Sequence, residues 1–329
     1  MPSKIILLFP GQASQYVGMG KELYESSAAA RHVLEETAEI DGLDHIPDLC
    51  FNGPADELTR TDNVQPAITA VSIMMLEAIR EKIDIAPIAC AGHSLGEYAA
   101  HYAAGNLDFQ TAMKLVQCRG DWMNEAAQPP NPAGSMVAVM GLGLDKLEVI
   151  VNEIGTDEII IANLNSPGQI ILSGTTQAVE RSIEMAKSAG AKRAVMLNVS
   201  GAWHSPLMKP AAEKMRGLLK EEITAGKINF QASPIVIANA TAEVVSGVDE
   251  MRDTLTRQIT SSVRWDESVK NLLQFASSDE NNGDNAPPLF VEVGPGKVLK
   301  GILRNINRSL NVQNVEDSAG VASLIEAIG

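Results

Sequence analysis

The chain is poor in several kinds of residue, and each shortage argues against a class of protein. It has three cysteines (Cys50, Cys90 and Cys118) and five histidines, and none of them shows metal-ligand spacing. No apolar run approaches the roughly 18 residues needed to span a bilayer. The 26 basic residues are outnumbered by 41 acidic ones, and the formal net charge is -15. We therefore expect no metal, no membrane and no nucleic-acid partner.

The N-terminal apolar run is also short. It covers Ile5–Phe9 and ends in Pro-Gly-Gln rather than in a small-residue cleavage site, unlike a secretory signal peptide. We expect a cytoplasmic protein with buried free thiols. A length of 329 residues and a hydrophobic content of 45% suit one large globular domain with an insertion, or two domains.

A candidate nucleophile lies in the motif Gly-x-Ser-x-Gly, formed by Gly92, Ser94 and Gly96. A mostly apolar run at 85–90 precedes it and a helix pattern follows it, which is the strand–turn–helix context of a catalytic serine. The N–H of Leu95 and the positive end of the helix dipole could then stabilise an oxyanion. The alternative is an ordinary serine in a glycine-bounded turn, because the bare pattern is frequent by chance.

Two further polar residues are expected at strand ends. Ile5–Phe9 reads as a buried parallel strand, so Gln12 in the following turn falls at the carboxyl edge of the sheet, where ligands bind. His204 precedes Ser205 as helix N-cap and Pro206 as the first helical residue, a strand-to-helix junction like that of Ser94. Its alternative role is that of a loop histidine with satisfied hydrogen bonds.

Arg119 lies on the apolar face of a predicted helix. The helix starts at Asp108 as N-cap and runs to about Ala127, and Arg119 follows Leu115 and Val116 at helical spacing. A guanidinium on an inward face is costly unless it has a partner. A structural ion pair and a snorkelling side chain are the two alternatives to a functional role.

The segment 129–198 has a pattern of its own. It begins after a proline-rich break and alternates strand and helix signals in the order βαββαβ, which is the ferredoxin-like unit. We predict an α/β protein in which residues 1–128 and 199–329 form a large hydrolase-like domain with a parallel sheet. Residues 129–198 form a small inserted ferredoxin-like domain.

Together these motifs resemble the malonyl-CoA:acyl carrier protein transacylase family, including the discrete acyltransferases of polyketide synthesis. The resemblance covers essentially the whole chain and implies the same two-part architecture. The residues that carry it are 9–15 (FPGQASQ), 92–98 (GHSLGEY), Arg119-Gly120, 162–169 (ANLNSPGQ), 204–208 (HSPLM), Arg257-Gln258 and 293–296 (VGPG).

The resemblance implies a cytoplasmic transferase of fatty acid or polyketide synthesis that needs no bound cofactor. Ser94 would be the nucleophile that is malonylated, and His204 its general base. Arg119 would bind the free malonyl carboxylate, for which a planar guanidinium is well shaped. The acyl group would pass from malonyl-CoA to the phosphopantetheine thiol of acyl carrier protein, and the enzyme would be a monomer.

The resemblance also implies supporting roles. The backbone N–H groups of Gln12 and Leu95 would form the oxyanion hole. The backbone carbonyl of Gln258 would orient the histidine ring in place of a triad aspartate. The expected lining of the acyl pocket consists of His93, Met123 and Asn163.

Some features depart from the family pattern or leave alternatives open. Ala13 stands where the family usually has glycine, and Trp203 where phenylalanine is common, which leaves acyl selectivity slightly open. The polar stretch 277–288 reads as an added surface loop. A thioester hydrolase and a non-catalytic scaffold are the alternative functions. An acidic carrier would need a local basic patch, for which the candidates are Lys192, Arg193, Lys209, Arg264, Lys297, Lys300 and Arg304.

Overall fold

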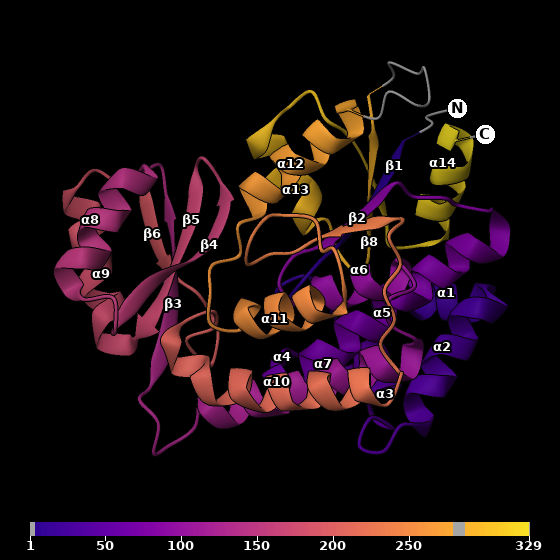
Figure 1. Ribbon diagram of the computed structural model, residues 1–329, viewed down its shortest axis with the longest axis horizontal. Helices are drawn as coiled ribbons and strands as arrows, with labels where there is room; N and C mark the ends of the chain where they lie inside the picture. Colours follow the sequence, from indigo (N-terminus) through magenta and orange to yellow (C-terminus); the bar gives the residue numbers. More distant parts are fainter. Residues whose placement is uncertain (1–3, 279–286, 329) are drawn as a thin grey trace.

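A parallel sheet forms the centre of the protein in the computed structural model, which describes residues 4–278 and 287–328 (Figure 1). Its strand order is β7-β2-β1-β8-β9, and all neighbouring strands are parallel. The strands are β1 (Ile5–Phe9), β2 (Ala89–Gly92), β7 (Ile235–Ile237), β8 (Leu289–Val293) and β9 (Asn311–Val315). Every residue of β1 is buried, as expected for a central strand covered on both faces.

Helices cover both faces of this sheet. Because side chains alternate along a strand, Leu7 and Phe9 face one hydrophobic core while Ile6 and Leu8 face another. The first core is the larger and includes α5 (Thr61–Lys82), α6 (Gly96–Ala103) and α7 (Phe109–Ala126). The second lies under α12 (Trp265–Ser278) and α13 (Val298–Ile306). The other helices are α1 (Lys21–Ser26), α2 (Ala28–Glu39), α3 (Ile46–Asn52), α4 (Ala55–Thr59), α10 (Lys209–Thr224), α11 (Val248–Gln258) and α14 (Ser318–Ile328).

A separate antiparallel sheet forms the smaller part of the molecule, on the left of Figure 1. It has the order β4-β5-β3-β6, and the elements follow one another as βαββαβ. They are β3 (Gly134–Met140), α8 (Leu144–Ile154), β4 (Ile159–Ser166), β5 (Gln169–Thr175), α9 (Thr176–Ser188) and β6 (Arg193–Met196). The predicted α/β class, with a parallel sheet and a separate ferredoxin-like unit, is confirmed; the domain boundaries at 129 and 198 stay a prediction.

Packing sets some of the element ends. Helix α5 begins at Thr61 and contains Pro66, because burial of its first two turns outweighs the missing N–H of proline. The strand expected at 85–90 is β2, which begins at Ala89, four residues later than predicted. The expected loop at 277–288 falls largely outside the described residues. Among the described residues, none of the helices is both long and apolar enough to cross a membrane.

Candidate active site

Ser94 lies in the sharp turn between β2 and α6. Its φ of 50° is in the left-handed region, which a non-glycine residue rarely occupies without a reason. The turn is possible because two glycines allow very close backbone contact. A Cβ on Gly96 would lie 2.1 Å from the carbonyl oxygen of Phe9, and one on Gly92 would lie 1.9 Å from Gly96 C. The two glycines of the motif therefore have a steric function, and the strand–turn–helix prediction is confirmed.

His204 faces Ser94, although the two residues are 110 positions apart. Its Nε2 lies 2.7 Å from Ser94 Oγ, and its Nδ1 lies 2.7 Å from the carbonyl oxygen of Gln258. That carbonyl can only accept, so Nδ1 carries the ring proton and Nε2 is free to accept one from the serine. Burial, and then the positive charge of Arg119, lower the pKa of His204 to about 3. The imidazole is therefore neutral at rest.

Arg119 is completely buried beside the nucleophile. Its Nη1 donates to Gln65 Oε1 at 2.7 Å, and its Nη2 donates to Gln258 Oε1 at 3.1 Å and to Ser94 Oγ at 3.2 Å. Within the described residues it forms no ion pair with a carboxylate, and its exposure of 0% excludes snorkelling. Both structural alternatives considered for it are therefore wrong. Burial lowers its pKa, because a charged guanidinium is costly to hold away from water.

The two amides expected in the oxyanion hole lie at neighbouring strand ends. Gln12 follows β1 and lines the cavity above Ser94, while Leu95 is the N-cap residue of α6. In the part of the chain that is described, neither N–H donates to a protein acceptor. Ala13 has a φ of 78°, and its N–H donates to Gln15 Oε1 at 2.8 Å. The alanine thus occupies a backbone conformation that glycine would adopt without strain.

A cavity of about 1290 Å³ opens onto the serine and histidine between the two sheets. Besides Ser94 and His204, three of the predicted site residues line it, Gln12, His93 and Asn163, together with Trp203. Asn163 belongs to β4, so the antiparallel sheet forms one wall of the cavity. The cavity can therefore hold a substrate that reaches Ser94 from outside.

Met123 differs from the other residues expected in the acyl pocket. It is 1% exposed and does not line the cavity. Its sulfur instead accepts a hydrogen bond from Gln65 Nε2 at 3.5 Å. Gln65 in turn holds Arg119, so Met123 contacts the site from behind.

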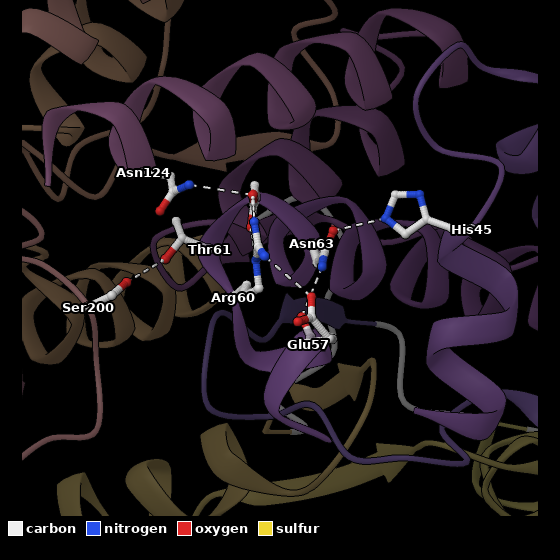
Figure 2. A network of polar contacts seen from close by, with 8 residues as sticks. His45, Glu57, Arg60, Thr61, Asn63, Asn124 and Ser200 are labelled. Carbon is white, nitrogen blue, oxygen red and sulfur yellow. Dashed lines mark hydrogen bonds and ion pairs between the residues drawn. The ribbon is translucent and has the colours of Figure 1, made fainter. Parts of the chain in front are cut away.

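A polar network forms the rim of the cavity at α4 and the start of α5 (Figure 2). Arg60 pairs with Asp62 at 2.8 Å and with Glu57 at 3.4 Å. Thr61 Oγ1 lies 3.5 Å from Ser200 Oγ, which connects this rim to the segment before His204. The cation of Arg60 is therefore already paired with acidic neighbours.

The candidate basic residues divide into two groups. Lys297 pairs with Glu316 and Arg264 with Glu267, each at 2.6 Å, and Lys209 lies 4.0 Å from Glu213. Those that form no ion pair with another described residue are Lys192, Arg193, Lys300 and Arg304. Only the second group could offer unneutralised positive charge to an acidic partner.

Sequence reasoning missed three buried side chains that surround this centre. Gln65 holds Arg119, Asn239 holds the nucleophile turn, and Glu97 contacts both Gln258 and Asn239. The sequence feature that could have pointed to them is a polar residue within an otherwise apolar stretch, such as Gln65 between Val64 and Pro66. Spacing along the chain could not show that they converge.

Comparison with known proteins decides the family. The model of the acyl transferase domain family matches residues 6–327. The chain belongs to this family. It is 43% identical to the malonyl CoA-acyl carrier protein transacylase of Bacillus subtilis, over 99% of this chain and 98% of the relative. The corresponding transacylase of Escherichia coli K12 is 35% identical, over 98% of this chain and 99% of its own.

Solved structures agree with the sequence relatives. The acyl carrier protein S-malonyltransferase of Vibrio cholerae superposes with a TM-score of 0.88 at 35% identity, covering 98% of this chain and all of that one. A malonyl-transacylase, PlMCAT, solved with the type II polyketide carrier protein AntF, gives a TM-score of 0.89 at 34% identity, over 99% and 100% of the two chains. The family predicted from the motifs is confirmed, and with it the expectation of an acyltransferase enzyme.

Proposed function

We propose that this family member transfers malonyl groups from malonyl-CoA to the phosphopantetheine thiol of acyl carrier protein through a malonyl ester on Ser94. The names of its relatives support the substrates. One observation of this chain carries the acyl specificity: the guanidinium of Arg119 is fully buried, lacks a carboxylate partner among the described residues and lies 3.2 Å from Ser94 Oγ. A malonyl carboxylate would supply the missing counter-charge.

In the first half-reaction, Ser94 Oγ attacks the thioester carbonyl of malonyl-CoA and gives its proton to His204 Nε2. The carbonyl oxygen becomes an oxyanion, which the N–H groups of Gln12 and Leu95 stabilise. As the C–S bond breaks, His204 returns the proton to the departing thiolate, and free CoA leaves. Through Nδ1, the Gln258 carbonyl holds the ring in the tautomer that both proton transfers need.

The second half-reaction repeats these steps with the carrier thiol as nucleophile. His204 takes the thiol proton, the sulfur attacks the malonyl ester, and the proton passes to Ser94 Oγ as the ester bond breaks. Arg119 exchanges its bond to Ser94 Oγ for bonds to the malonyl carboxylate when malonyl-CoA binds, and it keeps the acyl group in place through both half-reactions. No bound cofactor takes part in this scheme.

The experiment is to incubate the protein with malonyl-CoA and holo carrier protein and to follow the intact mass of both. The proposal expects a malonyl-enzyme adduct followed by malonyl-carrier, and neither product with Ser94→Ala. Steady release of free malonate without carrier loading would instead indicate a hydrolase. The absence of any enzyme adduct in the wild type would refute catalysis through Ser94 and leave a scaffold role.

A further inference from the structure

A carboxyl group, that of Glu97, is buried directly behind the catalytic centre and has no part in the mechanism above. Glu97 is the second residue of α6 and is 0% exposed. Its Oε2 accepts hydrogen bonds from Gln258 Nε2 at 2.5 Å and from the backbone N–H of Asn239 at 3.1 Å. A buried carboxyl is costly, so its presence here calls for a function.

Glu97 is one of three groups that determine which way the amide of Gln258 points. Gln258 Nε2 faces two groups that accept, Glu97 Oε2 and, at 2.9 Å, the carbonyl oxygen of Ser94. Its Oε1 faces the donor Nη2 of Arg119 at 3.1 Å. The reverse orientation would direct the Gln258 oxygen at two acceptors and its NH₂ at a guanidinium. Glu97 therefore helps to direct Gln258 Oε1 towards Arg119.

The same carboxylate contacts the residue that holds the nucleophile turn. Asn239 Oδ1 accepts the N–H of Ser94 at 2.6 Å, and its Nδ2 donates to the Gly92 carbonyl at 2.7 Å. With Gln258 on the Ser94 carbonyl, both peptide groups of this strained residue are fixed by side chains. Glu97 hydrogen-bonds to both of the residues that do this.

We propose that Glu97 is a positioning residue: by accepting from Gln258 and Asn239 it orients Arg119 towards the acyl carboxylate and fixes Ser94. This role rests on the proposed malonyl transfer. Without Glu97, the Ser94 carbonyl is the one acceptor left for the Gln258 NH₂ group, so the amide is held less firmly and Arg119 can lose one of its two amide partners. Malonyl transfer then suffers more than acetyl transfer, since the acetyl group has no carboxylate for Arg119 to bind.

Two variants distinguish the effect of the hydrogen-bond acceptor at position 97 from the effect of side-chain volume. Glu97→Gln keeps an oxygen that can accept, whereas Glu97→Leu has a similar volume and no acceptor. Both are compared with wild type by kcat/KM for malonyl-CoA and acetyl-CoA, normalised to the fraction of enzyme that forms an acyl adduct by intact mass. Removing the acceptor leaves a buried donor of Gln258 unsatisfied, which predicts a fall of about tenfold or more in the malonyl-to-acetyl ratio for Glu97→Leu. For Glu97→Gln the ratio stays within about threefold of wild type.

Equal losses for malonyl and acetyl in Glu97→Leu would overturn the proposal, because a purely structural defect lowers both. An equal fall of the ratio in both variants would also overturn it, since the charge and not the accepting oxygen would then matter. If Glu97→Leu does not fold, Gln258→Leu takes its place, because it keeps the backbone carbonyl that accepts from His204. Its kcat/KM must then fall more for malonyl-CoA than for acetyl-CoA, and an equal fall refutes the positioning role of Glu97. Wild type is measured first: no malonyl adduct there refutes the proposed function, whereas an adduct with an unchanged ratio in the variants refutes only the Glu97 role.

Discussion

Replacing Arg119 by alanine should change which acyl group the enzyme prefers. The guanidinium is 0% exposed and its partners within the described residues are the neutral groups of Gln65, Gln258 and Ser94. A bound malonyl carboxylate would therefore rely on this one side chain for charge compensation. Removing one partner of a buried ion pair costs about 3–5 kcal/mol. That corresponds to a loss of about 10²- to 10⁴-fold in kcat/KM for malonyl-CoA.

Acetyl-CoA supplies the internal control for this variant. An acetyl group has no carboxylate, so its transfer is affected only through the contact that Arg119 makes with Ser94 Oγ in the free enzyme, which is lost for both substrates. We therefore expect the malonyl-to-acetyl ratio of kcat/KM in Arg119→Ala to fall by about two orders of magnitude. Arg119→Lys keeps the charge without the planar fork and should lie between alanine and wild type.

The assay is steady-state transfer from each acyl-CoA to holo carrier protein, with circular dichroism to confirm that the variants are folded. An equal loss for malonyl and acetyl would refute the assignment of Arg119 as the carboxylate anchor. It would show that the residue acts only through the structure of the site or through Ser94.

Three further predictions concern the histidines and the nucleophile turn. The rate of malonyl-enzyme formation should fall only well below pH 6.5, because His204 stays neutral until the pH approaches its lowered pKa of about 3. A fall in this rate centred near pH 6.5, measured by rapid quench, would contradict this. Burial also lowers the pKa of His101 to about 3, so the unfolded state gains a proton first and stability falls as the pH drops below 6.5. Between about pH 7 and about pH 5, the free energy of unfolding in urea should therefore fall by about 2 kcal/mol less for His101→Gln than for wild type. Equal falls in the two proteins would refute the linkage. Gly96→Ala places a Cβ 2.1 Å from the Phe9 carbonyl oxygen, so its free energy of unfolding in urea should be about 3 kcal/mol or more below that of wild type. An unchanged free energy of unfolding would show that the turn relaxes freely.

Local patterns predicted the parts of the fold that local physics controls. The buried run Ile5–Phe9 is the central strand, and Asp108 caps α7 by accepting from the N–H of Thr111 at 2.7 Å. Element ends were less predictable, as Pro66 inside α5 shows, because packing decided them. The strand β9 and helix α14 near the C-terminus were not anticipated.

The site was predictable where a residue violated the pattern around it. Arg119 on an apolar helix face and Ser94 between two glycines each raised a question that the structure answers with a contact between them. Gln65 and Glu97 gave weaker signals, because a single polar residue in an apolar stretch does not reveal its partner. Their positions depend on contacts across 54 and 161 residues of the chain. Such convergence is a property of the folded protein.

A chase of the isolated acyl-enzyme tests the central claim most directly. The protein is loaded with malonyl-CoA, separated from it, and mixed with an equal amount of holo carrier protein, and both intact masses are followed with time. The account predicts one malonyl group on Ser94, mapped by peptide mass, which moves to the carrier thiol as the enzyme returns to its original mass. A malonyl group that leaves only as free malonate, or a modification at any residue other than Ser94, would contradict it.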